Sequence, residues 1–189
     1  DVYKRQALGD ADFDSDTDIN DVLAVIDFIL EEDFPTEDEF RNVDVNMDEE
    51  INIADIIMMV DIISGGNART MAFDMNEIAY VDLIQDYQNS KLGISIEYGG
   101  PVRGIELELE FDPEMVNIIS TGLSKIQDEV MVTSKRIEDG KLKVVVANLK
   151  SGPIEDDENL YLNLPLQFSG NDYQVSTVSL KDIKIAGAD

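Results

Sequence analysis

A repeat of 34 residues near the start of the chain constrains its fold more than any other feature. In both copies an acidic stretch is followed at once by an apolar segment. The acidic stretches begin at Asp10 and Asp44, and the apolar segments run over 22–30 and 56–63. A unit this short cannot bury its own apolar face, so the two copies should pack helix against helix. The repeat therefore predicts a small helical domain built from two equivalent halves.

The acidic stretches have the spacing of a loop that wraps a calcium ion. Such a loop of about twelve residues presents oxygen ligands at positions 1, 3, 5, 7 and 12, and position 7 uses its backbone carbonyl. The predicted ligands are Asp10, Asp12, Asp14, Asp16 and Asp21 in the first loop, and Asp44, Asn46, Asp48, Glu50 and Asp55 in the second. Hard oxygen ligands favour calcium over zinc or copper. We expect two calcium ions, whose binding is coupled to folding because the converging carboxylates repel one another without a cation.

Both loops depart from the common calcium-loop pattern. Position 6 usually carries glycine because the chain turns there with a positive φ, but Ser15 and Glu49 occupy it here. Position 8 is usually apolar, which fits Ile51 in the second loop but not Thr17 in the first. The second loop is therefore the better match. The alternative is an acidic, solvated loop without an ion, and two copies at matched spacing favour calcium over it.

The segments LGDADFDSDTDINDVLAVIDFIL and VDVNMDEEINIADIIMMVDIISGG resemble the paired repeats of a type I dockerin, an EF-hand-like module of secreted polysaccharide-degrading systems. Aspartate at position 12, in place of glutamate, is the dockerin form of the loop. The resemblance implies a protein partner that is read by positions 10 and 11 of each loop, which are Ile19, Asn20, Ile53 and Ala54. The helices carry more apolar surface than a two-helix core needs. That surface either docks a partner or packs against the rest of the chain.

Beyond residues 64–68 (SGGNA) the sequence changes to short alternating or β-branched runs, separated by Gly, Pro, Asp and Asn. This texture predicts an antiparallel β-sandwich of about eight or nine strands. Within 102–111, apolar residues alternate with Glu106, Glu108 and Glu110, which predicts a half-buried strand with an acidic outer face. Paired glutamates can hydrolyse glycosidic bonds, but nothing else in the sequence marks a cleft, so we expect no enzyme activity.

The segments GIELELEFDPEMV, GKLKVVVANL, NLYLNLPLQF and VSLKDIKI resemble strands of a cohesin domain. A carbohydrate-binding module shares this architecture, and the fold alone does not choose between them. Sugar-binding sandwiches usually present planar aromatic side chains. This chain has no tryptophan and its tyrosines are scattered, which counts against carbohydrate binding.

The predicted fold class is α plus all-β with two domains, an EF-hand-like helical pair followed by the sandwich. Residues 1–6 (DVYKRQ) look like a translated sequencing adapter, which would make the sequence a metagenomic fragment. We expect a dockerin-like domain at 7–66, a linker at 67–76 and a cohesin-like β-sandwich at 77–189.

Charge and composition limit the partners. Acidic residues outnumber basic ones by 41 to 14, which gives a net charge of −27 and disfavours nucleic acid and anionic membranes. Without cysteine or histidine the chain has no disulfide, no thiolate metal site and no Ser-His pair. No apolar run is long enough to insert in a membrane.

These observations predict a non-catalytic, calcium-dependent protein–protein attachment pair of a secreted or cell-surface protein. By resemblance it belongs to a cellulosome-like system of polysaccharide catabolism, with a cohesin or dockerin module as partner and possible packing between its own two modules. One alternative is a pair of C-terminal modules that anchor or stabilise a larger secreted hydrolase or protease. Another is a carbohydrate-binding module.

Overall fold

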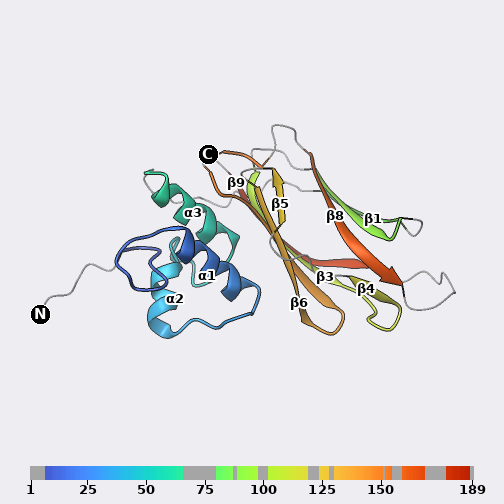
Figure 1. The fold of residues 1–189 in the computed structure, drawn as a ribbon, viewed down its shortest axis with the longest axis horizontal. Helices are drawn as coiled ribbons and strands as arrows, with labels where there is room; N and C mark the ends of the chain where they lie inside the picture. Colours follow the sequence, from blue (N-terminus) through green and yellow to red (C-terminus); the bar gives the residue numbers. More distant parts are fainter. Residues whose placement is uncertain are drawn as a thin grey trace, which may run out of the picture.

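The computed structural model describes residues 7–65, 80–86, 89–97, 102–118, 124–127, 130–150, 152–154, 159–168 and 178–187. These residues form a helical unit that lies against a β-sandwich (Figure 1). The predicted adapter at 1–6 and the predicted linker at 67–76 lie outside the described residues. The division into domains at 7–66 and 77–189 therefore stays a prediction.

The helical unit contains α1 (Ile19–Ile29), α2 (Glu37–Val43) and α3 (Ile53–Ile63). Helices α1 and α3 follow the two acidic loops, where the repeat predicts helices. The short helix α2 was not predicted, so the expected helical pair is wrong in number among the described residues. Its sequence signal is a capping box, because Thr36 accepts from the N–H of Glu39 and the Glu39 side chain accepts from the N–H of Thr36.

The sandwich consists of two antiparallel sheets, as the sequence predicts. The four-stranded sheet has the order β1 (Tyr80–Asp86), β2 (Lys91–Glu97), β8 (Asn159–Phe168), β4 (Val116–Ile118). The five-stranded sheet has the order β5 (Ser124–Gln127), β6 (Val130–Glu138), β7 (Lys141–Asn148), β3 (Val102–Glu110), β9 (Ser179–Gly187). All strand pairs in the described residues are antiparallel.

The core of the sandwich lies between the two sheets. Ile105, Leu107 and Leu109 of β3 are fully buried there, and they meet Leu92 and Ile94 of β2 in one hydrophobic cluster. Alternate side chains of a strand point to opposite faces, so this inner row leaves the glutamates of β3 on the outer face. The predicted alternation in β3 is confirmed.

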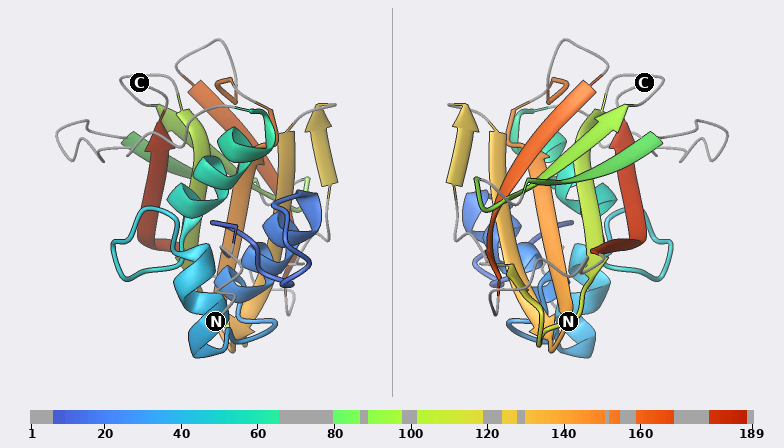
Figure 2. Two further views of the ribbon diagram at one scale, coloured as in Figure 1. Left: turned by 90° about the vertical axis from the view of Figure 1, so that its left-hand side faces the viewer. Right: turned by 90° about the vertical axis from the view of Figure 1, so that its right-hand side faces the viewer.

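A second core lies on the outer face of the five-stranded sheet, where the helical unit covers it (Figure 2, left). Helix α3 packs on β3, β7 and β9. The sheet residues that join the helices in this second cluster are Met131, Val145, Ala147 and Ala186. Along β7, Val144 and Val146 face the inner core while Val145 and Ala147 face the helices, so this strand is buried on both sides.

The molecule is therefore a stack of three layers. The helical unit is the first, the five-stranded sheet the second and the four-stranded sheet the third. The expected acidic outer face of β3 needs a correction at Glu106, which is half-buried beneath the helical unit. The surplus apolar surface of the helices explains this burial, because it covers the sheet. Among the described helices, none has the length and apolar content needed to cross a bilayer.

Candidate metal centre

The two acidic loops share one hydrogen-bonded scaffold, built around the carboxylate at position 12. Asp21 Oδ1 accepts from the N–H of Ala11 at 2.7 Å, and Asp55 Oδ1 accepts from the N–H of Val45 at 2.8 Å. In each loop the second oxygen of this carboxylate accepts from the N–H of the residue at position 9, at 2.7 and 2.9 Å. The position 12 side chain thus ties both ends of its loop together.

The turn at position 6 also repeats, although neither loop has glycine there. Ser15 has a φ of 89° and Glu49 a φ of 68°. Each N–H at this position donates to the carboxylate at position 1, Ser15 to Asp10 Oδ2 and Glu49 to Asp44 Oδ2, both at 3.1 Å. A residue with a side chain costs about 1–2 kcal/mol in the left-handed region, so the backbone of each loop is strained at position 6.

The first loop gathers carboxylates closely enough to hold one ion. Oxygens of Asp10, Asp12 and Asp21 all lie within 4.8 Å of one another, which suits an ion with ligands at about 2.4 Å. Asp10 is only 2% exposed, and its Oδ1 is buried with no hydrogen-bond partner. A buried carboxylate oxygen without a partner is costly unless a cation meets it. The residues present therefore fit calcium.

The outer part of the first loop is crowded with negative charge. Asp14 Oδ1 accepts from the N–H of Asp16 at 3.1 Å. The side-chain hydrogen bond to Asp14, followed by the negative charge of that neighbour, raises the pKa of Asp16. Carboxylates this close compete for a proton when no cation separates them.

The second loop repeats the arrangement with one fewer carboxylate, since Asn46 takes position 3. Asp48 Oδ1 accepts from the N–H of Glu50 at 2.9 Å, and the Asn46 amide donates to Asp48 Oδ2 at 2.8 Å. Burial, opposed by backbone hydrogen bonds and reinforced by the charge of Asp44, raises the pKa of Asp55 to about 7. The ten predicted ligands thus lie in two equivalent loops, and calcium binding by them stays a prediction.

The predicted partner positions fall in two different environments. Ile19 is 43% exposed and Asn20 is exposed, whereas Ile53 and Ala54 are fully buried. Ile53 lies on β3, where a Cβ built on Gly104 would come within 2.5 Å of Ile53 Cγ1. Only glycine at this strand position lets the helix approach so closely. Ile53 faces the chain's own sandwich, and partner binding at all four positions stays a prediction.

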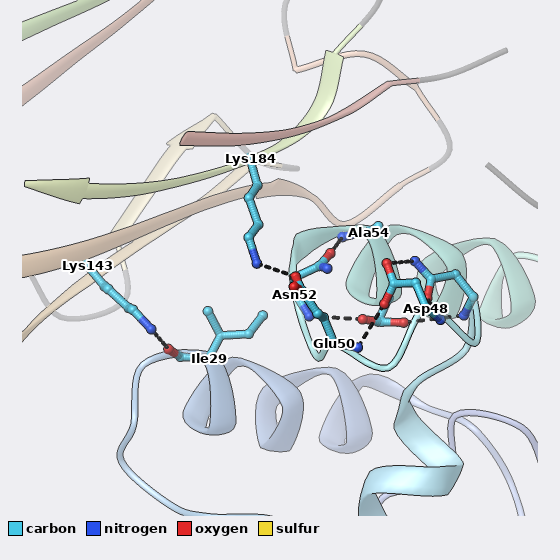
Figure 3. Close-up of polar contacts among 9 residues, drawn as sticks. Ile29, Asp48, Glu50, Asn52, Ala54, Lys143 and Lys184 are labelled. Atoms are coloured by element: carbon cyan, nitrogen blue, oxygen red, sulfur yellow. Dashed lines mark hydrogen bonds and ion pairs between the residues drawn. The ribbon is translucent and has the colours of Figure 1, made fainter. Parts of the chain in front are cut away.

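Ion pairs join helix α3 and its loop to the sheet. Arg103 of β3 donates from Nη1 to Asp61 Oδ2 at 2.7 Å, and its Nη2 lies 2.7 Å from Asp61 Oδ1. Lys184 of β9 donates to Glu50 Oε2 at 2.8 Å, at position 7 of the second loop (Figure 3). The Arg103 side chain is buried, so its pair with Asp61 is screened little by water.

Two further lysines of the sheet reach the end of α1, which has no basic residue in its last turn. Lys143 of β7 donates to the carbonyl of Ile29 at 3.2 Å (Figure 3) and to Glu31 Oε1 at 3.0 Å. Lys135 of β6 donates to the carbonyl of Glu31 at 3.1 Å. Cations at a helix C-terminus offset its partial negative charge, so the sandwich supplies a cap that the helix lacks.

The sequence left packing between the two modules open as one of two uses of the apolar helix surface. The contacts that form this interface were not predicted, although two signals pointed to them. The run VVVA at 144–147 is apolar without alternation, which is typical of a strand buried on both faces. Residues 7–66 contain 19 acidic side chains and one basic side chain. Positive side chains that pair with this acidic surface are therefore expected from the sandwich.

No family model matches the chain, and no curated protein matches it. Among solved structures it is similar to a cohesin module from a Clostridium perfringens family 33 glycoside hydrolase, with 21% identity, a TM-score of 0.43, and coverage of 58% of this chain and 82% of that one. It is also similar to the sixth cohesin of Acetivibrio cellulolyticus scaffoldin B, solved in complex with a dockerin, with 17% identity, a TM-score of 0.41, and coverage of 59% and 86%.

A third similar structure is a type I cohesin–dockerin complex from Clostridium thermocellum, with 12% identity, a TM-score of 0.41, and coverage of 59% of this chain and 81% of that one. Because the TM-scores of all three structures lie below 0.5, the function of this chain has to be argued from its own residues.

Proposed function

We propose that this chain is a non-catalytic, calcium-dependent attachment module. The observation that carries the proposal is the first loop, where three carboxylates converge and a buried oxygen of Asp10 lacks a partner. The second loop supports it, because it repeats the same scaffold 34 residues later. Two calcium ions are proposed, one in each loop.

Calcium supplies the positive charge that neutralises each ring of acidic oxygens. The chain's own residues do the rest. Asp21 and Asp55 hold the ends of their loops together, and each lies in the first turn of the helix that follows. A loop fixed in this way presents its helix in one orientation, which a protein-binding surface requires.

The attachment itself is supported by how the helices are used within the chain. The helical unit lies on the outer face of the β-sandwich through apolar contacts and ion pairs. The proposed setting is a secreted or cell-surface, polysaccharide-degrading assembly, and the proposed external partner is a cohesin or dockerin module.

Calorimetric titration of the chelator-stripped chain with calcium, with a thermal melt at each end point, tests the calcium sites. We expect two sites and a higher melting temperature, because free calcium at 100 times the dissociation constant adds about 2.7 kcal/mol per site. Asp10→Asn and Asp44→Asn should each remove one site. Asp33→Asn, outside both loops, is the control for the loss of one carboxylate. Absence of both heat and a melting shift would contradict the proposal.

Binding of the calcium-loaded chain to immobilised panels of cohesin and of dockerin modules tests the attachment. Binding to a panel member that a chelator abolishes supports it. If the chain binds calcium but no member of either panel, the attachment part of the proposal is wrong and the chain is a calcium-stabilised spacer.

A further inference from the structure

The segment Glu50–Ala54 belongs to two sites at once. On one side it is part of the second calcium loop, where Glu50 is a predicted carbonyl ligand. On the other side it contacts the sandwich, because the Glu50 carboxylate binds Lys184 and the Ile53 side chain packs over Gly104 (Figure 3 for Lys184 and Glu50). Between them Asn52 is buried and caps α3 through the N–H of Ala54.

The equivalent segment of the first loop, Asp16–Asn20, has no such second role in the described residues. Asp16, Ile19 and Asn20 are exposed. Their hydrogen bonds stay within the loop and the start of α1, as in the contact of Asp18 with the Asn20 N–H at 2.6 Å. The first copy meets the sheet at the far end of α1 instead, where Ile29 and Glu31 accept from Lys143 and Lys135. Filling the first loop therefore acts on the docked contacts less directly than filling the second.

We propose that calcium binding in the second loop and docking of the helical unit on the five-stranded sheet are thermodynamically linked, while the first loop binds calcium independently. The inference rests on the proposed calcium function and adds its regulation. Without an ion the carboxylates of Asp44, Asp48 and Asp55 repel one another and the loop opens. Opening shifts Glu50 and Ile53, which are the contacts that hold this loop to β9 and β3.

Linkage is reciprocal, so the docked sandwich must tighten calcium in the second loop by the same factor by which calcium tightens docking. The sheet face of β3, β7 and β9 is then closed by the chain's own helices when calcium is present, and accessible when calcium is withdrawn. Contacts far from the loop reduce the extent to which calcium withdrawal weakens docking, but they do not abolish the linkage. Arg103 pairs with Asp61 near the end of α3 and holds the docked state without touching a predicted ligand.

Whether a lysine substitution strengthens or weakens calcium binding distinguishes linkage from simple electrostatics. Lys184→Met removes a positive charge next to an anionic loop, which by Coulomb's law alone strengthens calcium binding. If docking supports the loop, the same change weakens binding. Lys181→Met, on the same strand with an exposed side chain, is the matched control for the charge.

Calcium affinity is measured with one loop disabled at a time, in Asp10→Asn and in Asp44→Asn backgrounds of the full chain. Lys184→Met and Arg103→Met should each weaken the second loop by about 5-fold or more, at the lower end of typical coupling, and leave the first loop within 2-fold. Lys181→Met should weaken neither. Unchanged or tighter binding in the second loop for both substitutions overturns the linkage, although calcium binding itself remains.

The reciprocal effect has its own readout, the rate of acylation of Lys184 and Lys143 by an amine reagent, followed by peptide mass spectrometry. Calcium should slow both reactions in the wild type and in Asp10→Asn, but not in Asp44→Asn. Equal rates with and without calcium in a chain that binds two ions also overturn the linkage. A chain that binds no calcium overturns both the linkage and the proposed function, so the two failures are distinguishable.

Discussion

The two copies of the acidic repeat have the same local structure but different surroundings. Their loops match in hydrogen bonds and in the positive φ at position 6. Yet Ile19 at position 10 of the first copy is exposed, whereas Ile53 at position 10 of the second is fully buried on the sandwich. The residues of a loop therefore determine its geometry, while contacts with a distant part of the chain determine what the copy does.

Truncating position 10 in each copy should give the largest difference between them. Ile53→Ala should lower the free energy of unfolding by about 2–5 kcal/mol, because it leaves a cavity under α3. Ile19→Ala should change it by about 0.5 kcal/mol or less, as exposed positions usually do. Denaturant unfolding in excess calcium measures both. Equal effects would mean that the second copy is not packed on the sheet in solution.

Adding a single methyl group to β3 should disturb the second copy of the repeat, because that copy packs on this strand. Gly104→Ala places a Cβ 2.5 Å from Ile53 Cγ1 and 3.0 Å from Ile57 Cγ1, so it should destabilise the chain by about 1–3 kcal/mol. Gly93→Ala is the matched control on β2, where the nearest atom would be Ile84 Cβ at 3.5 Å.

The double variant Gly104→Ala with Ile53→Ala tests whether these two residues meet. The smaller side chain makes room for the added methyl group, so the double variant should be less destabilised than the sum of the single variants. Strict additivity in unfolding experiments would place the two residues out of contact.

Sequence patterns predicted the parts of the fold that depend on local spacing. The loops, α1 and α3 follow from the repeat, and β3 follows from the alternation of Ile105, Leu107 and Leu109 with glutamates. Helix α2 was missed because its seven residues carry no apolar period, although Thr36 and Glu39 mark its start.

The docked arrangement could not be predicted in the same way. Glu50 and Lys184 are 134 residues apart in the sequence, and neither residue indicates its partner. Glu106 was expected on an exposed acidic face. Alternation shows that a side chain points away from the inner core, but it does not show what covers that side chain. Covering that face requires the surplus apolar surface of the helices, which the sequence indicates without showing where it packs.

Helix α1 has a weaker connection to the sandwich than α3, and its connection should be measurable. Lys143→Met removes the donor to the Ile29 carbonyl and should cost about 0.3–1 kcal/mol, the usual value for a cation at a helix C-terminus. Hydrogen exchange should quicken in the last turn of α1 and stay unchanged in α3. The exposed Lys150→Met is the control for the loss of one charge.

The smallest expected effect concerns the pH dependence of the covered face. Burial is the largest influence on Glu106 and raises the pKa of its carboxyl above the ordinary 4.5, against the opposing effect of Lys184, Lys143 and the N–H of Ile53 and with the added effect of Asp182. In the pH range between the unfolded and the folded pKa, the folded chain binds more protons than the unfolded chain. The contribution of Glu106 to stability is therefore present below pH 4.5 and lost as the pH rises through the folded value.

Glu106→Gln abolishes this titration, so the stability of the wild type should fall relative to that of the variant as the pH rises from 4.5 towards neutral. Melting both proteins in excess calcium over this range keeps the helical unit on the sheet, and the calcium contribution, common to both proteins, cancels in the difference between them. Glu110→Gln, exposed at the end of the same strand, controls for the loss of one carboxylate. A difference between wild type and Glu106→Gln that stays constant with pH would mean that water reaches Glu106. The second copy of the repeat would then not exclude water from the outer face of β3, and in this respect it would resemble the first copy, whose Ile19 is exposed.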